Sequence, residues 1–281
     1  MTTIVFIAVL LAALLHAIWN SLVKGGRDKY LNMSAVAFGY VPISAVSLLI
    51  VPFPAIESWP YIVSSMFLHA GYMAFLLRSY HHGDLTQTYP IARGSAPLMV
   101  AVVSVFVLGV SLSSFEMLSL LFIGAGIMSL SLVRRESGLR NTHAVQLALI
   151  TGAFIAAYSI NDGLGVRLSG SPVGYFAATA LGVAAIWGIG TACVRPDAFR
   201  AVATKARGTF LIGGNASFIA YVLVVWAFTQ APIALVSALR ETSIIFALLI
   251  GVGFLKEKLD LAKVASTFMT LIGVVLLRLA K

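Results

Sequence analysis

The sequence predicts an all-α membrane protein with ten transmembrane helices, arranged as two inverted five-helix repeats. Three observations lead to this fold class: the composition, the number of long apolar stretches, and a partial repetition of the first half of the chain in the second. Of the 281 residues, 60% are hydrophobic and only 10% are charged, and the mean hydropathy is +0.98. Because an ordinary soluble domain has about 25% charged residues, the chain is expected to lie in a lipid bilayer.

Ten apolar stretches are long enough to cross a hydrocarbon core of roughly 30 Å, which takes about 20 helical residues. Glycine, proline and charged residues concentrate between them, and no connection leaves room for a soluble domain. The predicted membrane helices cover approximately residues 3–23, 33–52, 60–80, 86–108, 114–133, 144–162, 172–193, 208–228, 232–255 and 259–279. The first has no basic residue ahead of its apolar run, so we expect a retained helix and not a cleaved signal peptide.

Prolines fall inside two of these stretches. Pro42 lies within the second predicted helix, and Pro90 and Pro97 flank Arg93 in the fourth. Each removes an amide donor and kinks or loosens its helix. Such positions suit hinges beside a central site, and they suit static packing equally well.

The basic residues predict an orientation. Connections 1–2, 3–4, 5–6, 7–8 and 9–10 carry 14 of the 19 lysines and arginines, the opposite side carries three, and Arg93 and Arg240 lie within helices. By the positive-inside rule the basic side is cytoplasmic and both termini are outside. The net charge of +9 is thus explained by topology and lipid contact, and no nucleic-acid partner is expected. Cys193 is the only cysteine, which excludes an internal disulfide.

The second half of the chain partly repeats the first. Residues 89–118 align with residues 236–265, and neighbouring segments align after small shifts. The matched pairs are Arg93 with Arg240, Ser95 with Thr242, Tyr72 with Tyr221, and Trp19 with Tyr158. A five-helix unit begins and ends on opposite sides of the membrane, so its second copy is inverted, and we expect repeats over residues 1–140 and 141–281. Secondary transporters with this arrangement place substrate at the midplane; the alternative is that two apolar segments align by composition alone.

The ends of two predicted helices carry a more specific pattern. The segments IARGSAPLMVAVVSVFVLG and RETSIIFALLIGVGFLKEKL resemble the EamA-like group of the drug/metabolite transporter superfamily, whose pattern closes with L-G-E-R/K-L. Glu257 matches the final Glu, whereas Val110 stands at that position in the first half. The resemblance implies a ten-helix secondary carrier, often an exporter of amino acids or other small metabolites, without ATP hydrolysis. Relatives commonly have cytosolic termini; the expectation of outside termini here follows the charge count of this chain.

Arg240 and Glu241 stand side by side in the apolar stretch SALRETSIIF. Arg240 follows Pro232 by eight residues, so it lies roughly 12 Å along its helix, near the bilayer centre. A central arginine costs about 2.5–3.5 kcal/mol even on lenient scales, and such residues mark function by default. Arg93 would approach from the opposite face, giving two guanidinium groups for a carboxylate and Glu241 for an ammonium group. In the alternative, Glu241 pairs with an arginine only to hold helices together.

Further polar and aromatic residues recur at helical spacing and are candidates for the wall of a substrate site. They are His16, Trp19 and Asn20 in the first predicted helix, His69 and Tyr72 in the third, Tyr158 in the sixth and Tyr221 in the eighth. The aromatic residues offer cation–π surfaces, and His16 and Asn20 offer hydrogen bonds. Alternatively these residues form an interfacial belt or interhelical contacts. Asp162 is expected at the end of the sixth helix, which leaves Glu241 as the only carboxylate in mid-membrane.

These features predict a secondary active transporter, not an enzyme, in a bacterial-type cytoplasmic (inner) membrane. It is expected to export a small amino-acid-like or other zwitterionic or anionic metabolite by alternating access; the alternative is an efflux carrier for cationic or lipophilic compounds. The sequence has no HExxH, G-x-S-x-G or Walker motif, and neither a cofactor nor a metal is expected. The expected partners are the lipid bilayer and a small-molecule solute, with protons as a candidate coupling ion through Glu241, in a monomer or weak dimer.

Overall fold

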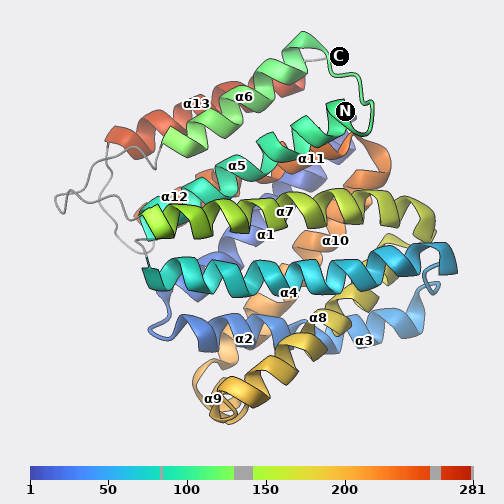
Figure 1. Cartoon of the computed structure of the whole chain (residues 1–281), viewed down its shortest axis with the longest axis vertical. Helices are drawn as coiled ribbons and strands as arrows, with labels where there is room; N and C mark the ends of the chain where they lie inside the picture. The colour runs from blue at the N-terminus through green and yellow to red at the C-terminus, as the bar shows by residue number, and fades with distance from the viewer. Residues whose placement is uncertain (83–84, 130–141, 254–260, 280–281) are drawn as a thin grey trace.

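The computed structural model describes residues 1–82, 85–129, 142–253 and 261–279, and every regular element in these ranges is helical. Long helices lie side by side across the molecule (Figure 1). The elements are α1 (Thr3–Gly25), α2 (Lys29–Gly39), α3 (Val41–Ile50), a 3₁₀ turn η1 (Ile56–Ser58), α4 (Trp59–His82), α5 (Leu85–Phe106), α6 (Ser114–Ser129), α7 (Thr142–Ser169), α8 (Pro172–Val194), α9 (Asp197–Lys205), a π-helical turn η3 (Thr209–Gly213), α10 (Gly214–Gln230), α11 (Ile233–Arg240), α12 (Ser243–Gly253) and α13 (Leu261–Leu279). The predicted all-α class is therefore confirmed.

Seven helical segments in the described ranges are long and apolar enough to cross a membrane. They are Thr3–Val23, Lys29–Ile50, Ile56–Ser79, Thr142–Ser169, Pro172–Val194, Thr209–Gln230 and Ile233–Ile250. Three shorter apolar helices cover Pro90–Phe106, Ser114–Ser129 and Val264–Leu279. Large apolar side chains such as Leu49 and Phe106 are exposed on the outer surface, where lipid would cover them.

Two stretches predicted as single helices are interrupted. The first breaks between Gly39 and Val41, and Pro42 occupies the first turn of α3, where its missing amide hydrogen costs nothing. The second breaks after Arg240: the amides of Glu241 and Thr242 donate to carbonyls three residues back, at 3.0 and 3.1 Å. This 3₁₀-like turn, a feature often found at functional hinges, places the charged pair at a junction between two helices.

Pro90 and Pro97 do not interrupt α5, which runs continuously through both. The connection between α8 and η3, predicted as polar loop, contains the additional helix α9. Its Ala198 and Val202 are buried in one cluster with residues of α2, while Arg200 is exposed. A helix with one apolar face and one basic face suits the membrane–water interface.

The two ends of the chain meet. The guanidinium of Arg278 in α13 donates to the hydroxyl of Thr3 in α1 at 2.8 Å, and both termini lie at the same end of the molecule (Figure 1). At the opposite end, Arg195 after α8 pairs with Asp28 before α2 at 2.6 Å. Chain ends on one side require an even number of membrane crossings.

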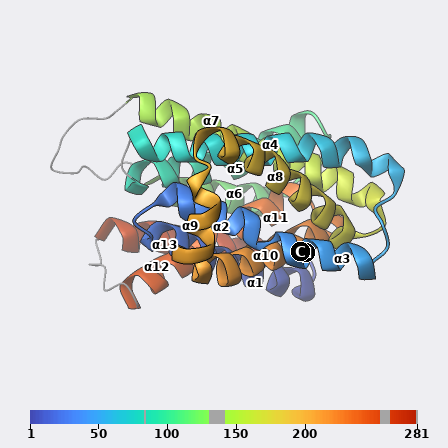
Figure 2. The ribbon, with the colours of Figure 1, turned by 90° about the horizontal axis from the view of Figure 1, so that it is seen from below.

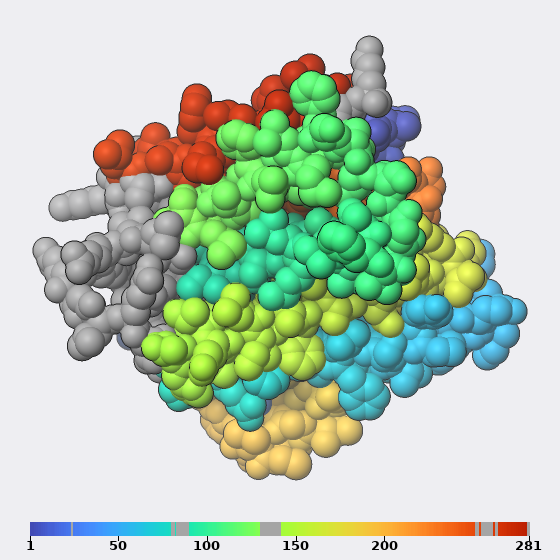
Figure 3. Space-filling model, turned by 45° about the horizontal axis from the view of Figure 1, so that its top comes forward, coloured from blue at the N-terminus to red at the C-terminus, as the bar shows by residue number. Residues whose placement is uncertain are grey.

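The main helix contacts pair elements far apart in sequence. α6 packs along α13, α4 and α5 pack against α7, and α1 packs against α10; Figure 2 shows the same bundle from below. On the surface α6 and α13 lie next to each other (Figure 3). Four of the helices named here, α1, α4, α7 and α10, line the cavity described next.

Candidate functional site

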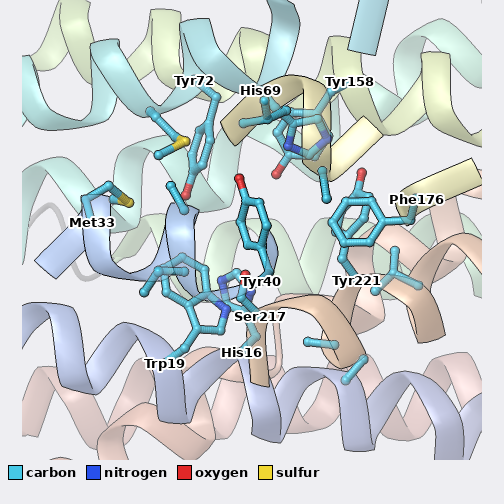
Figure 4. Close-up of a pocket in the computed structure, with 18 of the residues that line it drawn as sticks. His16, Trp19, Met33, Tyr40, His69, Tyr72, Tyr158, Phe176, Ser217 and Tyr221 are labelled. Atoms are coloured by element: carbon cyan, nitrogen blue, oxygen red, sulfur yellow. The ribbon is translucent and has the colours of Figure 1, made fainter. Parts of the chain in front are cut away.

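A cavity opens between α1, α2, α4, α7, α8, α10 and α11 (Figure 4). Its volume is about 80 Å³. A buried water needs roughly 10–15 Å³ by this measure, so there is room for about five to eight waters or a solute of similar size. The polar and aromatic side chains that line it are His16, Trp19, Tyr40, His69, Tyr72, Tyr158, Phe176, Ser217, Tyr221 and Arg240.

Most of the predicted site residues lie on this wall. The ones that line it are His16, Trp19, His69, Tyr72, Tyr158, Tyr221 and Arg240. His69 and Tyr72 share a face of α4 because they are three residues apart, and both contact Tyr158 on α7. The ring of His69 stacks on that of Tyr158 with centroids 4.0 Å apart, and Tyr72 meets it edge-on at 5.7 Å. Figure 4 shows His69 and Tyr158 close together, with Tyr72 to one side of them.

Three predicted site residues lie elsewhere. The side-chain amide of Asn20 donates to the carbonyl of His16, one turn back in α1, at 2.9 Å. Arg93 and Glu241 lie behind the wall, with exposed fractions of 2% and 0%. Nη1 of Arg93 donates to Oε1 of Glu241 at 3.0 Å.

Arg240 completes a buried cluster of three charges. Its Nη2 donates to Oε1 of Glu241 at 3.4 Å and to the hydroxyl of Ser159 at 3.5 Å, and its guanidinium lies 5.7 Å from the ring centre of Tyr158. These contacts agree with the alternative stated in the sequence analysis, in which Glu241 pairs with an arginine to hold helices together. Among the described residues, the two guanidiniums share this one carboxylate.

Of the three charged residues, Arg240 is the one that reaches the cavity. Its side chain is 3% exposed, it lines the wall, and its Nε is buried without a hydrogen-bond partner. A buried charge without full compensation is costly. Arg240 therefore brings to the wall a guanidinium that has an unused donor within the described part of the chain.

Asp162 is a functional candidate that was not among the predicted site residues. The helix was predicted to end at this residue, but α7 continues to Ser169, so Asp162 lies inside it and is fully buried. The prediction that Glu241 is the only mid-membrane carboxylate is therefore wrong. One signal was present: Tyr158 and Asp162 stand four residues apart, which places them on the same helix face.

Asp162 accepts hydrogen bonds from three other helices. Nε2 of His69 donates to Oδ2 at 3.1 Å, the hydroxyl of Tyr221 donates to Oδ2 at 2.6 Å, and the hydroxyl of Tyr175 donates to Oδ1 at 3.0 Å. Asn161, the neighbour in α7, adds a longer contact to Oδ1 at 3.4 Å. His69 and Tyr221 belong to the cavity wall, so the carboxylate lies directly behind it.

Tyr40 and Phe176 also line the cavity and were not predicted. Neither of the predicted helices that contain them carries a predicted site residue, so no spacing to another candidate marked Tyr40 or Phe176 as a site residue. Glu257, the residue that matches the family ending, lies outside the described residues. In the described ranges no group of three or more His, Cys, Asp or Glu side chains is arranged to hold a metal ion.

Residues 143–279 match the model of the EamA-like transporter family. The chain belongs to this family. It is thus a transporter of the drug/metabolite transporter type, and family and helices together make this EamA-like protein an integral, multi-pass membrane protein. The match spans the second half of the chain, the half that contributes Tyr158, Tyr221 and Arg240.

A solved structure titled only as the crystal structure of a protein superimposes on the EamA-like protein with a TM-score of 0.71. The alignment covers 99% of this chain and 96% of the other, at 18% sequence identity. At that identity the likeness shows the fold alone. No curated protein matches the sequence.

Proposed function

We propose that the EamA-like protein is a secondary active carrier that exports a small zwitterionic or anionic metabolite, of amino-acid type, across the cytoplasmic membrane with protons as coupling ion. Alternating access would occur at the cavity described above. The observation that carries the proposal is Arg240, a buried guanidinium on the cavity wall whose Nε has no hydrogen-bond partner.

The charge balance favours a solute that carries a carboxylate. Among the described residues, Arg240 shares the carboxylate of Glu241 with Arg93, so an incoming anion would find a positively charged group on the wall at Arg240. A guanidinium fork binds a carboxylate with two parallel hydrogen bonds. The aromatic residues that line the cavity, Tyr72 among them, offer π surfaces to the ammonium group of a zwitterion. The cavity volume of about 80 Å³ suits a small amino acid.

The helix contacts support an inverted repeat. Exchange of the proposed halves, residues 1–140 and 141–281, would map α1 onto α7, α2 and α3 onto α8, α4 onto α10, α5 onto α11 and α12, and α6 onto α13. The contact of α4 with α7 then has its counterpart in α10 with α1, and that of α4 with α8 has its counterpart in α10 with α2. The contact of α5 with α7 corresponds in the same way to that of α11 and α12 with α1.

Ten crossings agree with the position of the chain ends. Seven long segments would leave the termini on opposite sides, whereas Thr3 and Arg278 are hydrogen-bonded. If the three shorter apolar helices also cross, the number is even. The proposed boundary between the repeats lies outside the described residues.

The first experiment is exchange counterflow in proteoliposomes loaded with unlabelled amino acids, with uptake of a radiolabelled amino-acid mixture as readout. Arg240→Ala should lower uptake about tenfold or more, as expected for the loss of a hydrogen bond to a charged group. The matched control is Arg200→Ala, which removes an exposed arginine of α9 and should leave uptake unchanged. No uptake by folded wild-type protein, or equal uptake by both variants, would contradict the proposal.

The aromatic lining favours one other candidate, a carrier for organic cations. Aromatic rings from several helices surround the space, and such cages bind cations. Arg240 on the same wall opposes that use by charge repulsion. If the solute is a cation, Arg240→Ala should raise its uptake, whereas loss of a zwitterion's uptake excludes this alternative.

A further inference from the structure

The geometry points to the pair His69–Asp162 as the binding site of the coupling proton, with the proton entering from the cavity at the imidazole of His69. This inference rests on the proposed carrier function and assigns the proton to a different residue from Glu241, the carboxylate that the sequence suggested. Four structural features support it: the environment of Asp162, the exposure of His69, the charges around the pair, and the helices that the pair connects.

Asp162 is arranged to hold a charge permanently, not to bind a solute. It is fully buried, and both of its oxygens accept hydrogen bonds from Tyr175, Tyr221 and His69. It is not among the residues of the cavity wall. An ammonium group would have to displace these donors, whereas a proton needs no additional space.

His69 connects this carboxylate to the cavity. Its side chain is 14% exposed, and it forms part of the wall (Figure 4). Because an ionised carboxylate only accepts hydrogen bonds, Nε2 carries the hydrogen of the 3.1 Å contact, and Nδ1 is the atom that takes up a proton. Imidazole is the side chain whose charge ordinarily changes between pH 5 and 8.

Ionisable groups on several helices face the pair. Tyr158 of α7 stacks on His69, Tyr221 of α10 meets it edge-on at 5.1 Å, and Tyr175 of α8 contacts Asp162. Beyond Tyr158 lies Arg240, bonded to Glu241 and through it to Arg93. His16 of α1 lies on the same cavity wall. Asp162 is thus the anion in direct contact with His69 and would stabilise an imidazolium there.

The pair joins the two proposed halves of the molecule. His69 lies in α4 of the first half, and its partner carboxylate lies in α7 of the second. Uptake of a proton on Nδ1 turns the hydrogen bond between a neutral imidazole and the carboxylate into an ion pair, which strengthens this link. The ring centre of Tyr158 lies 4.0 Å from that of His69 and 5.7 Å from the guanidinium of Arg240, so a single ring connects the proton site to the proposed anion site.

The test compares two kinds of uptake by the same proteoliposomes, using the radiolabelled amino-acid mixture. One is counterflow at equal pH, and the other is accumulation driven by a pH gradient. Asp162→Asn should abolish gradient-driven accumulation, measured as the ratio of that accumulation to the counterflow of the same variant. His69→Gln is the second variant, needed if Asp162→Asn does not fold, because a glutamine amide still donates to Asp162 but cannot bind a proton. Asp197→Asn and His143→Gln, both at exposed positions, are the matched controls.

The outcomes separate this inference from the proposed function. Absence of counterflow in the wild-type protein contradicts the carrier proposal itself. The proposed proton site is overturned if counterflow is present and accumulation driven by a pH gradient persists in Asp162→Asn or in His69→Gln. The proton site is also overturned if that accumulation is lost in Glu241→Gln or His16→Gln while both variants of the pair retain it.

Discussion

Arg93, Glu241 and Arg240 form a cluster of three charged side chains in the interior of the protein. Oε1 of Glu241 accepts from both arginines, at 3.0 and 3.4 Å. Removal of charges from water is costly, and their attraction offsets that cost only while each partner is present. Glu241 therefore has a structural role that is independent of any solute.

Glu241→Gln should lower the free energy of unfolding by about 3 kcal/mol or more, because it removes the counter-charge that two buried guanidiniums share. Unfolding by heat or denaturant in detergent measures this. Glu57→Gln, at an exposed site in η1, is the matched control and should change stability by less than about 0.5 kcal/mol. Equal free energies of unfolding for the two variants would contradict the structural role of Glu241.

Two helices meet at the basic end of the molecule through Asp28. Its Oδ1 accepts from the amide of Leu31 and so caps α2 at 2.9 Å, and its Oδ2 pairs with Arg195 after α8. The hydrogen bond from Arg195 lowers the pKa of Asp28 below its usual range. A lowered pKa in the folded state stabilises the protein above the unfolded-state pKa, near pH 4, and this contribution is lost as the pH falls through the folded-state value.

Asp28→Asn should therefore be less stable than the wild type at neutral pH, with a difference that shrinks as the pH falls below about 4. Asparagine still caps a helix. Asp28→Ala removes the cap as well, so it should lower the free energy of unfolding by about 0.5–2 kcal/mol more at every pH. Melting temperatures of the three proteins between neutral and acidic pH measure both effects. A difference between wild type and Asp28→Asn that is constant with pH would contradict the ion pair.

The crossing of α2 with α10 depends on two glycines in backbone contact. A Cβ atom on Gly214 would collide with the backbone of Gly39, and one on Gly39 would collide with the carbonyl of Phe210. Gly214→Ala should therefore destabilise the protein by about 1–3 kcal/mol, since the backbone must shift. Gly190→Ala in α8, where nothing lies within 4 Å, is the control and should be neutral or stabilising by up to about 1 kcal/mol. Equal melting temperatures for both variants would contradict this close approach.

The whole molecule separates two ends of different charge. η1 follows α3 at the end that contains both termini, and α9 lies at the opposite end with the described basic residues Arg195, Arg200 and Lys205 (Figure 1). If the positive-inside rule holds, α9 faces the cytoplasm and the termini face outward.

Single cysteines in a Cys193→Ser background test this orientation. An impermeant maleimide added to intact cells should label Glu57→Cys and not Arg200→Cys, which should react only after the membrane is permeabilised. The reverse pattern would place the termini in the cytosol, as is common among relatives. Labelling of both positions in intact cells would contradict the topology as a whole.

The sequence alone predicted the all-helical class, and the described residues contain seven helical segments long and apolar enough to cross a membrane, because apolar length is the main requirement for a membrane helix. It also identified much of the cavity wall, since a polar residue is costly in lipid and usually faces a partner or cavity. His16, Trp19, His69 and Tyr72 could be grouped because helical spacing places near neighbours on one face.

Tertiary structure alone decided which charges are paired and which face the cavity. Glu241 and Arg93 are 148 residues apart, and no periodicity within one helix reports such a contact. The same is true of Asp162, whose surroundings come from α4, α8 and α10. The sequence determines that charged residues enter the membrane because each side chain carries its own transfer cost, but their partners depend on how helices pack, which is a property of the whole chain.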